Sequence, residues 1–174
     1  TPTRYLWSDA HTYPNEVRVP RLVRKVLPFA LNYLRTWDRQ AADRVDLFIA
    51  NSKFVAQRIH KYYRRPSTVI YPPVNVGKFS VSEKDGDYFF MAGRLVSYKR
   101  FDLAIRVFNR LGLPLKIVGI GPESNKLKKM AGKNIEFLDL VSDERLADLY
   151  AGSRALIFPQ EEDFGIVPLE SMAS

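Results

Sequence analysis

Residues 88–108 read YFFMAGRLVSYKRFDLAIRVF, and they run through a strand, a loop and a helix in that order. YFFMA is a short apolar run rich in aromatic residues, as expected for a strand. From about Lys99, apolar residues recur at helical spacing and share one face of the predicted helix: Phe101, Ala104, Ile105 and Phe108. A strand that leads through a loop into an amphipathic helix is the repeating unit of an α/β fold.

The same alternation of strands and helices continues toward residue 174. The further predicted elements are strand LKIVG (115–119), helix ESNKLKKMA (123–131), strand IEFL (135–138), helix DERLADLYAG (143–152), strand ALIFP (155–159) and a helix from about Ile166. This order predicts an α/β fold with a parallel sheet and right-handed crossovers. Ligands bind such sheets outside the carboxyl ends of the strands, so the loops that lead into the helices are the places to look for function.

A second group of elements comes before residue 75. It comprises a basic amphipathic helix within residues 17–45, which Pro28 should kink, strand VDLFIA (45–50), helix NSKFVAQRIHKYY (51–63) with Ser52 as its cap, and strand STVIY (67–71). From Pro72 to about residue 86, proline, glycine and charge replace periodicity, as in a connection between domains. We therefore predict a first domain at 1–74, a linker at 75–86 and a second domain at 87–174.

The composition excludes several kinds of site. The 174 residues are 46% hydrophobic and 26% charged, and no apolar run approaches the roughly 18 residues that span a bilayer. Cysteine is absent, which excludes disulfides, thiolate metal sites and cysteine nucleophiles and agrees with a reducing, cytoplasmic location. With His11 and His60 as the only histidines, a multi-histidine metal site is excluded too. Both termini look cut, so we expect a fragment of a longer protein.

The net charge of +8 is unevenly distributed along the chain. Residues 1–65 hold 13 lysines and arginines against five acidic residues, and residues 66–140 hold 12 against seven. Residues 141–174 hold only two against seven. This polarity indicates that the front of the chain meets an anionic partner, such as a membrane surface, a phosphorylated ligand or nucleic acid, and that the tail does not.

The loop GRLVSYKR, residues 93–100, carries the residue types of a phosphate site. Gly93 permits close approach of a ligand to the backbone, Arg94 offers a planar fork of donors, and Lys99 lies where the next helix presents its positive end. The alternative interpretation is a solvated basic turn. A Walker A site is excluded, because no GK[ST] occurs.

The loop GIGPES, residues 119–124, resembles the start of a dinucleotide-binding fingerprint but departs from it. Ser124 occupies the position of the third glycine, and a proline follows the second glycine, so NAD binding is not expected. Gly119 and Gly121 then either allow a tight turn beside a ligand or serve turn geometry alone.

The stretch EEDFGIVPLE, residues 161–170, places three acids before a helix and one acid inside it. On a single helix, Glu162 and Glu170 would be separated by about 12 Å of rise, too far for a glycosidase pair of carboxylates. Pro168 fits a first helical turn, so Glu162 stays in the loop, where it can accept hydrogen bonds from sugar hydroxyls, while Glu170 reaches another part of the same ligand. Gly165 lets the amides at the helix start, near Ile166, face a phosphate. The alternative is that the acids only complement the helix dipole.

Together these motifs resemble the retaining glycosyltransferases of group 1, family 4, which have the GT-B fold of two Rossmann-like domains. The resemblance rests on GRLVSYKRFDLAI, IVGIGPE, IEFLDLVSDERLADLY and above all EDFGIVPLE, with its two glutamates separated by seven residues. TPTRYLW, FIANSKFVAQRI and VIYPPVNVGKF extend it over nearly the whole chain. The residues of these motifs most resemble those of mannosyltransferases of surface polysaccharide or O-antigen synthesis, which usually take GDP-mannose. It implies the end of an N-terminal acceptor domain followed by part of a donor domain.

The resemblance also implies a role for each candidate residue. Arg94 and Lys99 would grip the diphosphate of the donor and neutralise the leaving nucleotide. Glu162 would hold hydroxyls of the transferred sugar, and the amides around Phe164 and Gly165 would lie near its phosphate. The remaining implied contacts are the ribose at Glu170, the base near Val141, and the close backbone approaches at Gly93, Gly119 and Gly121.

The family pattern further implies that no metal or cofactor is needed, because the cationic side chains replace a divalent ion. Retention without an evident protein nucleophile would imply attack by the acceptor on the face that the leaving group vacates. Asp139 departs from the pattern, since glycine is common at its position in the family. The resemblance covers only part of each of the two domains of the family. We therefore expect residues 1–174 alone to be inactive.

The expected partners are a nucleotide-sugar donor and a glycan or lipid-linked acceptor, without nucleic acid. The basic segment at 17–37 either lies on the inner face of the cytoplasmic membrane or packs inside the acceptor domain. A non-catalytic protein that binds a phosphorylated ligand or nucleic acid is the competing function, but its surface should be basic throughout, whereas residues 141–174 are acidic. A glycogen-synthase or sucrose-synthase type of specificity is a third alternative.

Overall fold

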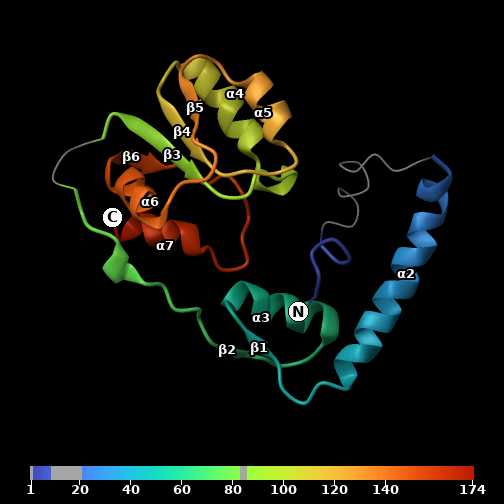
Figure 1. Cartoon of the computed structure of the whole chain (residues 1–174). Coiled ribbons are helices and arrows are strands. Elements are labelled where there is room, and N and C mark those ends of the chain that lie inside the picture. The colour runs from blue at the N-terminus through green and yellow to red at the C-terminus, as the bar shows by residue number, and fades with distance from the viewer. Residues whose placement is uncertain (1, 9–20, 83–85) are drawn as a thin grey trace. The chain divides into compact units, whose positions relative to one another are not determined.

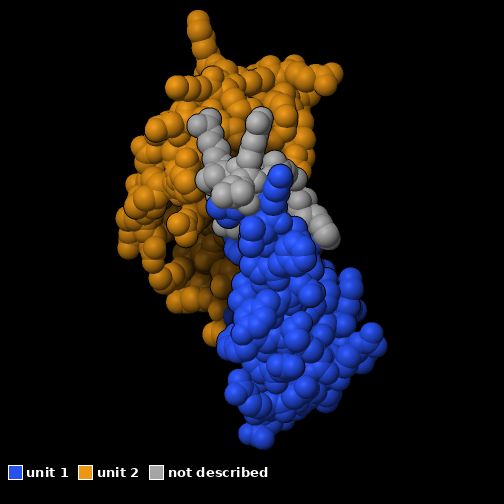
Figure 2. All heavy atoms as spheres, turned by 90° about the vertical axis from the view of Figure 1, so that its right-hand side faces the viewer, with its two compact units in different colours: residues 1–72 blue, residues 73–174 orange. Residues whose placement is uncertain are grey.

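The computed structural model describes residues 2–8, 21–82 and 86–174, and it divides into two compact units, Thr1–Pro72 and Pro73–Ser174. Figure 1 shows the chain as a ribbon, and Figure 2 distinguishes the two units by colour. His11, residues 17–20 of the predicted basic helix and residues 83–85 of the predicted linker lie outside the described residues. Each unit is described by itself.

The second unit has the predicted α/β fold, with a four-stranded, wholly parallel sheet in the order β5-β4-β3-β6. Its strands are β3 (Tyr88–Ala92), β4 (Leu115–Val118), β5 (Ile135–Phe137) and β6 (Ser153–Leu156). Its helices are α4 (Phe101–Leu111), α5 (Ser124–Met130), α6 (Asp143–Ala151) and α7 (Ile166–Met172), with short 3-10 turns η1 (Val76–Lys78) and η2 (Ser97–Lys99). The carboxyl ends of all four strands meet at one edge of the sheet, as parallel pairing requires.

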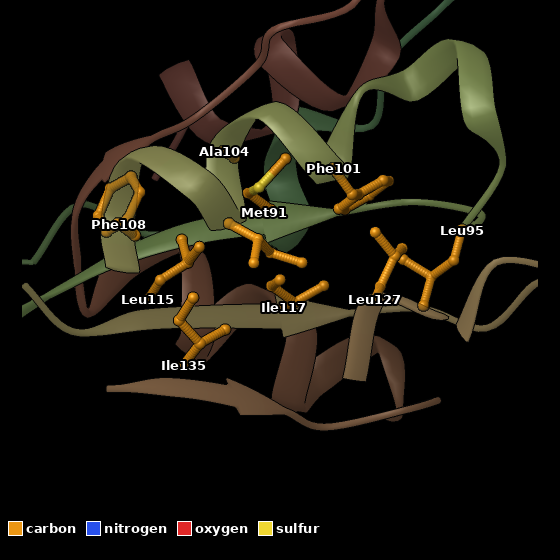
Figure 3. Close-up of a cluster of buried hydrophobic side chains, with 10 residues drawn as sticks. Met91, Leu95, Phe101, Ala104, Phe108, Leu115, Ile117, Leu127 and Ile135 are labelled. Atoms are coloured by element: carbon orange, nitrogen blue, oxygen red, sulfur yellow. The ribbon is translucent and has the colours of Figure 1, made fainter. Parts of the chain in front are cut away.

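Helices cover both faces of this sheet. Successive side chains of a strand point to opposite faces, so Met91 enters the core beneath α4 and α5, while Phe90 enters the core beneath α6 and α7. The first core receives the predicted apolar face of α4, and Figure 3 shows Phe101 and Phe108 of that helix with Met91 and Ile117 of the strands. Ile117 is fully buried, so its truncation to alanine would cost about 2 to 5 kcal/mol.

Several boundaries in the second unit differ from the sequence-based expectation, including the end of β6 at Leu156 instead of Pro159, and two of the differences have a clear local cause. Helix α4 begins at Phe101 and not at Lys99, because Arg100 adopts the left-handed conformation with φ 54° and separates η2 from the helix. Strand β6 begins at Ser153 and not at Ala155, because its pairing with β3 already starts where Tyr88 meets Ser153, with a register shift before Phe89.

The first unit contains α2 (Arg21–Asp43), β1 (Ile49–Ala50), α3 (Lys53–Tyr63) and β2 (Thr68–Val69). The prediction for α3 is confirmed, since the Ser52 hydroxyl accepts a hydrogen bond from Val55 N at 3.0 Å and caps the helix. The strands are shorter than predicted, and within the described residues they pair only with each other, in parallel. His60 is exposed on α3.

A half-buried carboxylate links the elements of the first unit. Asp38 Oδ2 accepts hydrogen bonds from Trp7 Nε1 at 2.7 Å and from the Tyr63 hydroxyl at 2.8 Å, so it joins α2 to α3 and to the N-terminal segment. Burial, reinforced by Asp38, raises the pKa of Tyr63 above its ordinary value. The phenol therefore remains a donor at neutral pH.

Helix α2 continues through Pro28 and leaves a row of large apolar side chains exposed. Phe29 is 78% exposed and Tyr33 72% exposed, and Val26 and Trp37 lie beside them at helical spacing and are also exposed. Among the described residues, no helix combines the length and apolar character that crossing a bilayer requires.

Candidate active site

A cleft of about 900 Å³ opens at the carboxyl ends of β3 and β4, within the second unit. Six residues predicted from the sequence line it: Gly93, Arg94, Gly119, Gly121, Val141 and Glu170. One wall is apolar and is formed by Leu140, Leu146 and Val167. The cleft therefore lies where ligands bind in open parallel sheets.

The loops that form the floor of the cleft are held together backbone to backbone. Gly93 N donates to Val118 O at 3.0 Å, Leu95 N donates to Ile120 O at 3.0 Å, and Glu123 N donates to Leu95 O at 3.1 Å. These bonds extend the β3–β4 pairing beyond the ends of the strands. The floor is thus a rigid continuation of the sheet.

This close approach explains the glycines of the GIGPES loop. A Cβ on Gly119 would lie 1.9 Å from Gly93 O, and Gly119 also has a φ of +140°. A Cβ on Gly121 would lie 2.3 Å from Leu95 O. Both positions therefore exclude a side chain for reasons of packing, whatever the ligand.

Ser124, which replaces the third glycine of a dinucleotide fingerprint, closes the same loop. Its hydroxyl donates to Gly121 O at 2.7 Å and accepts from Gly121 N at 3.0 Å. The departure from the fingerprint thus has a structural reason, because the serine side chain fixes the turn that a glycine would leave open.

Lys99 and Glu162 form an ion pair, although neither is among the residues that line the cleft. Lys99 Nζ lies 2.8 Å from Glu162 Oε1, and the two side chains are 13% and 24% exposed. The same ammonium lies 3.4 Å from the position that a Cβ on Gly93 would take, which places it against the cleft lining. Arg94, which follows Gly93 in the sequence, is exposed and lines the cleft itself. Of these three predicted residues, Arg94 therefore lines the cleft, and the ion pair of Lys99 and Glu162 lies next to Gly93 of the lining.

Glu170 lies in the cleft lining, in contact with a residue that the sequence did not single out. The Tyr150 hydroxyl donates to Glu170 Oε2 at 3.1 Å, and both residues line the cleft. Burial, followed by the nearby Glu170 carboxylate, raises the pKa of Tyr150. The available signal was an aromatic residue with a polar tip on the apolar face of α6, a side chain that usually finds a partner when it is buried.

Phe164, Gly165 and Ile166 occupy the loop after β6 and the start of α7, and they are not among the residues that line the cleft. Gly165 has a φ of +86° and precedes Ile166, the first residue of α7, as the pattern predicts. Pro168 lies in the first turn of the helix, where its missing N–H has no cost.

Asp139 lies two residues after the end of β5 and has a left-handed backbone conformation with φ 50°. Its carboxylate accepts a hydrogen bond from Lys128 Nζ at 2.7 Å, and its carbonyl accepts one from Gly119 N at 2.7 Å. This conformation suits the glycine that is common there in the resembled family, and aspartate is among the few other residues that tolerate it. Within the part of the chain that the structure describes, no group of three or more His, Cys, Asp or Glu side chains could hold a metal ion.

Comparison with known families matches the chain to two family models. The model "Glycosyl transferases group 1" matches residues 77–174, and the model "Glycosyltransferase Family 4" matches residues 7–78. The chain belongs to the group 1 glycosyl transferases. The Family 4 match ends at residue 78 and the group 1 match begins at residue 77, close to the boundary between the two units of this glycosyl transferase. No curated protein sequence matches the chain.

Three solved structures illustrate the similarity of the fold. Sucrose-phosphate synthase from Thermosynechococcus elongatus is 17% identical, with a TM-score of 0.68 over 79% of this chain and 41% of its own. A variant of S. aureus TarM, in complex with fondaparinux, α-GlcNAc-glycerol and UDP, is 16% identical, with a TM-score of 0.67 over 80% of this chain and 30% of its own. Anabaena HepE, in complex with UDP and glucose, is 18% identical, with a TM-score of 0.62 over 76% of this chain and 43% of its own.

These similarities establish that the glycosyl transferase has an α/β fold with parallel sheets and flanking helices, as in GT-B enzymes. The chain spans 41%, 30% and 43% of the lengths of the three solved structures.

Proposed function

We propose that this protein transfers a hexose, mannose by preference, from a nucleoside-diphosphate sugar to a glycan or lipid-linked acceptor with retention of configuration. The observation that carries the proposal is a cleft at the carboxyl ends of parallel strands that Arg94 and Glu170 line, with the Lys99–Glu162 ion pair next to Gly93 of its lining. The family provides the class of reaction.

The charges in the cleft match the parts of such a donor. Arg94 and Lys99 bind the diphosphate, because a guanidinium in the cleft lining and an ammonium next to Gly93 of that lining provide several charge-assisted donors for phosphate oxygens. Glu162, held next to Lys99, accepts hydrogen bonds from hydroxyls of the sugar that follows the diphosphate. Glu170 accepts hydrogen bonds from the ribose, and the base lies along the apolar wall near Val141.

The same residues favour the transition state over the ground state. Glycosyl transfer breaks the bond between the anomeric carbon and the phosphate oxygen, and negative charge grows on the nucleoside diphosphate. Fixed cations that are already in place stabilise this growing charge more than they stabilise the intact donor. Arg94 and Lys99 provide this stabilisation with no metal ion or cofactor. The acceptor attacks from the face that the leaving group vacates, which retains the configuration.

The ligands of related folds support this class of donor. TarM was solved with UDP and HepE with UDP and glucose, so the fold accommodates nucleoside diphosphates and hexoses. The competing function, a non-catalytic protein for nucleic acid, requires a uniformly basic surface. Residues 141–174, which contain Glu162 and Glu170, instead carry seven acidic residues against two basic ones. The charge distribution therefore favours the enzyme.

We place the enzyme in the cytoplasm, at the inner face of the membrane. The exposed side chains Phe29, Tyr33 and Trp37 of α2 can enter a lipid interface, and residues 1–65 are strongly basic, which complements anionic lipid. A lipid-linked acceptor would then be presented at the surface to which the enzyme is bound.

A thermal-shift screen of the full-length protein against GDP-mannose, UDP-glucose, UDP-GlcNAc and ADP-glucose tests the donor class. A ligand at 100 times its dissociation constant adds about 2.7 kcal/mol of stability, so one donor should raise the melting temperature clearly. NMR of the product sugar then reports the anomeric configuration. A protein that none of the four donors stabilises, or that inverts the anomeric centre, contradicts the proposal.

A further inference from the structure

The contact between Tyr150 and Glu170 suggests a function for Tyr150 and for Phe79, to which the proposed chemistry assigns none. Tyr150 lies on α6 and Glu170 on α7, and the tyrosine hydroxyl donates to Oε2 of the glutamate at 3.1 Å. Only 3% of Tyr150 is exposed, although it belongs to the cleft lining. The hydroxyl is thus the polar tip of an otherwise buried ring, directed at a carboxylate of the site.

Two other aromatic rings hold Tyr150 in place. The ring of Phe90 on β3 packs edge-on against Tyr150, with 5.0 Å between the ring centroids. The ring of Phe79 also packs edge-on against Tyr150, with 5.8 Å between the centroids, and belongs to the same core. Perpendicular aromatic pairs of this kind attract each other beyond the effect of burial alone. The Tyr150 ring is therefore fixed in position, and the direction of its hydroxyl follows.

Phe79 comes from the segment VNVGKF, residues 74–79, which lies after the unit boundary and contains η1, and Phe79 directly follows that turn. Its side chain is half-buried against the core that contains Tyr150 and Val118. This segment therefore supports the cleft from behind through Tyr150, although its residues are not among those that line the cleft.

The donor state of the contact is also fixed. Because burial and Glu170 raise the pKa of the phenol, Tyr150 keeps its proton over the whole neutral range. The phenol can only donate to the carboxylate, and an ionised carboxylate has acceptor sites on both oxygens. With Oε2 held by Tyr150, Oε1 remains to face a ligand in the cleft.

We infer that Tyr150, supported by Phe79, is a positioning residue that orients the Glu170 carboxylate toward the ribose hydroxyls of the nucleotide. This inference rests on the proposed function, in which Glu170 binds the ribose. Tyr150 itself does not touch the reacting atoms. Its effect is confined to the hydroxyls that Glu170 holds.

The test compares nucleotides with and without those hydroxyls. The probes are GDP, UDP and ADP, each beside its 2′,3′-dideoxy analogue, and calorimetry gives the dissociation constants for the full-length protein. The variant Tyr150→Phe removes only the hydroxyl. Tyr63→Phe is the matched control, because Tyr63 is also buried and also donates to a carboxylate, Asp38, but lies in the first unit.

For the nucleotide that binds, the wild-type protein should prefer the ribose form to the dideoxy form. In Tyr150→Phe this preference should fall about tenfold, the effect of losing one hydrogen bond that orders a charged group. Tyr63→Phe should keep the preference of the wild type. If removal of the hydroxyl only loosened the structure, binding of the ribose form and of the dideoxy form would weaken equally.

Equal weakening of both forms, or an unchanged preference in Tyr150→Phe, overturns the positioning role and leaves the proposed function standing. A wild-type protein that binds none of the three nucleoside diphosphates overturns the proposed function itself. If Tyr150→Phe lowers the melting temperature, the ratio of the two dissociation constants in the folded variant still decides the question, because it is measured within one protein.

Discussion

Lys99 Nζ and Glu162 Oε1 lie 2.8 Å apart, although the two residues are separated by 63 positions in the sequence and follow different strands. The pair joins the loop after β3 to the loop after β6, with the Lys99 side chain next to Gly93 of the cleft lining. Because both side chains are largely buried, the ammonium and the carboxylate fix each other before a ligand arrives. A bound donor would share this arrangement, with phosphate at the ammonium and sugar at the carboxylate.

Glu162→Gln therefore separates sugar recognition from nucleotide recognition. The substitution keeps the shape of the side chain and removes its charge, so we expect kcat to fall about 100-fold. The Kd for the nucleoside diphosphate should stay the same or decrease, because Lys99 is no longer neutralised. Steady-state kinetics and calorimetry measure the two effects. Glu161→Gln is the neighbouring control, and lost nucleotide binding with normal kcat in Glu162→Gln would be the opposite of this expectation.

Arg94→Ala should reduce turnover through the leaving group. Loss of one preorganised donor to developing charge lowers kcat by about 100-fold to 1000-fold, equivalent to roughly 3 to 4 kcal/mol. Arg106→Ala removes the same side chain from the exposed face of α4, where it pairs with Asp102, and should leave kcat unchanged. Equal kinetics for the two variants would remove Arg94 from the proposed mechanism.

Three glycine-to-alanine variants separate backbone packing from backbone conformation. Gly119→Ala should cost about 3 kcal/mol or more, since its Cβ would meet Gly93 O at 1.9 Å and φ is +140°. Gly112→Ala has open space but a φ of +68°, so it should cost about 1 kcal/mol. Gly77→Ala has neither problem and should be nearly neutral. Chemical denaturation gives the three values, and any other rank order contradicts the packing of the loops.

Alkaline pH should weaken the fold through its buried tyrosines. Tyr63 and Tyr150 have raised pKa values in the folded state, whereas an unfolded tyrosine loses its proton near pH 10. Above about pH 10 the unfolded state therefore binds fewer protons than the folded state, and stability falls as pH rises through the folded values. Melting temperatures should decline less steeply in Tyr63→Phe or Tyr150→Phe than in the wild type. Parallel curves would show that neither phenol is linked to folding.

Helix α2 should bind anionic membranes through its exposed apolar row. The full-length protein should float with vesicles that contain anionic lipid and remain in solution with neutral vesicles. Phe29→Asp should abolish flotation, because the side chain is 78% exposed and would place a charge in the lipid interface. Asn32→Asp adds the same charge at another exposed position of α2 and should have a smaller effect. A wild-type protein that does not float retires the membrane proposal.

The fold of the second unit was predictable because its strands and helices have clear periodicity. The apolar face Phe101, Ala104, Ile105 and Phe108 is buried as the spacing indicates, and α7 begins at Ile166 as Gly165 and Pro168 indicate. The boundaries that differ depend on single backbone conformations, such as the left-handed Arg100. Periodicity does not encode such a local feature.

The candidate site was predictable as a set of loops but not as a set of contacts. Spacing shows that Lys99, Glu162 and Glu170 follow strands of one sheet, yet it does not show which side chains meet. The pairing of Lys99 with Glu162 depends on the neighbouring positions of β3 and β6, which only the sheet order reveals. Tyr150 was missed because its role depends on a partner 20 residues away on another helix.

A crystal structure of the protein with the nucleoside diphosphate that stabilises it most would show directly what the cleft binds. We expect the diphosphate beside Arg94 and Lys99, the ribose hydroxyls at Glu170, and the base along the wall near Val141. A nucleotide bound elsewhere, or one bound in the cleft with its phosphates away from both cations, would contradict the assignment of this cleft as the donor site.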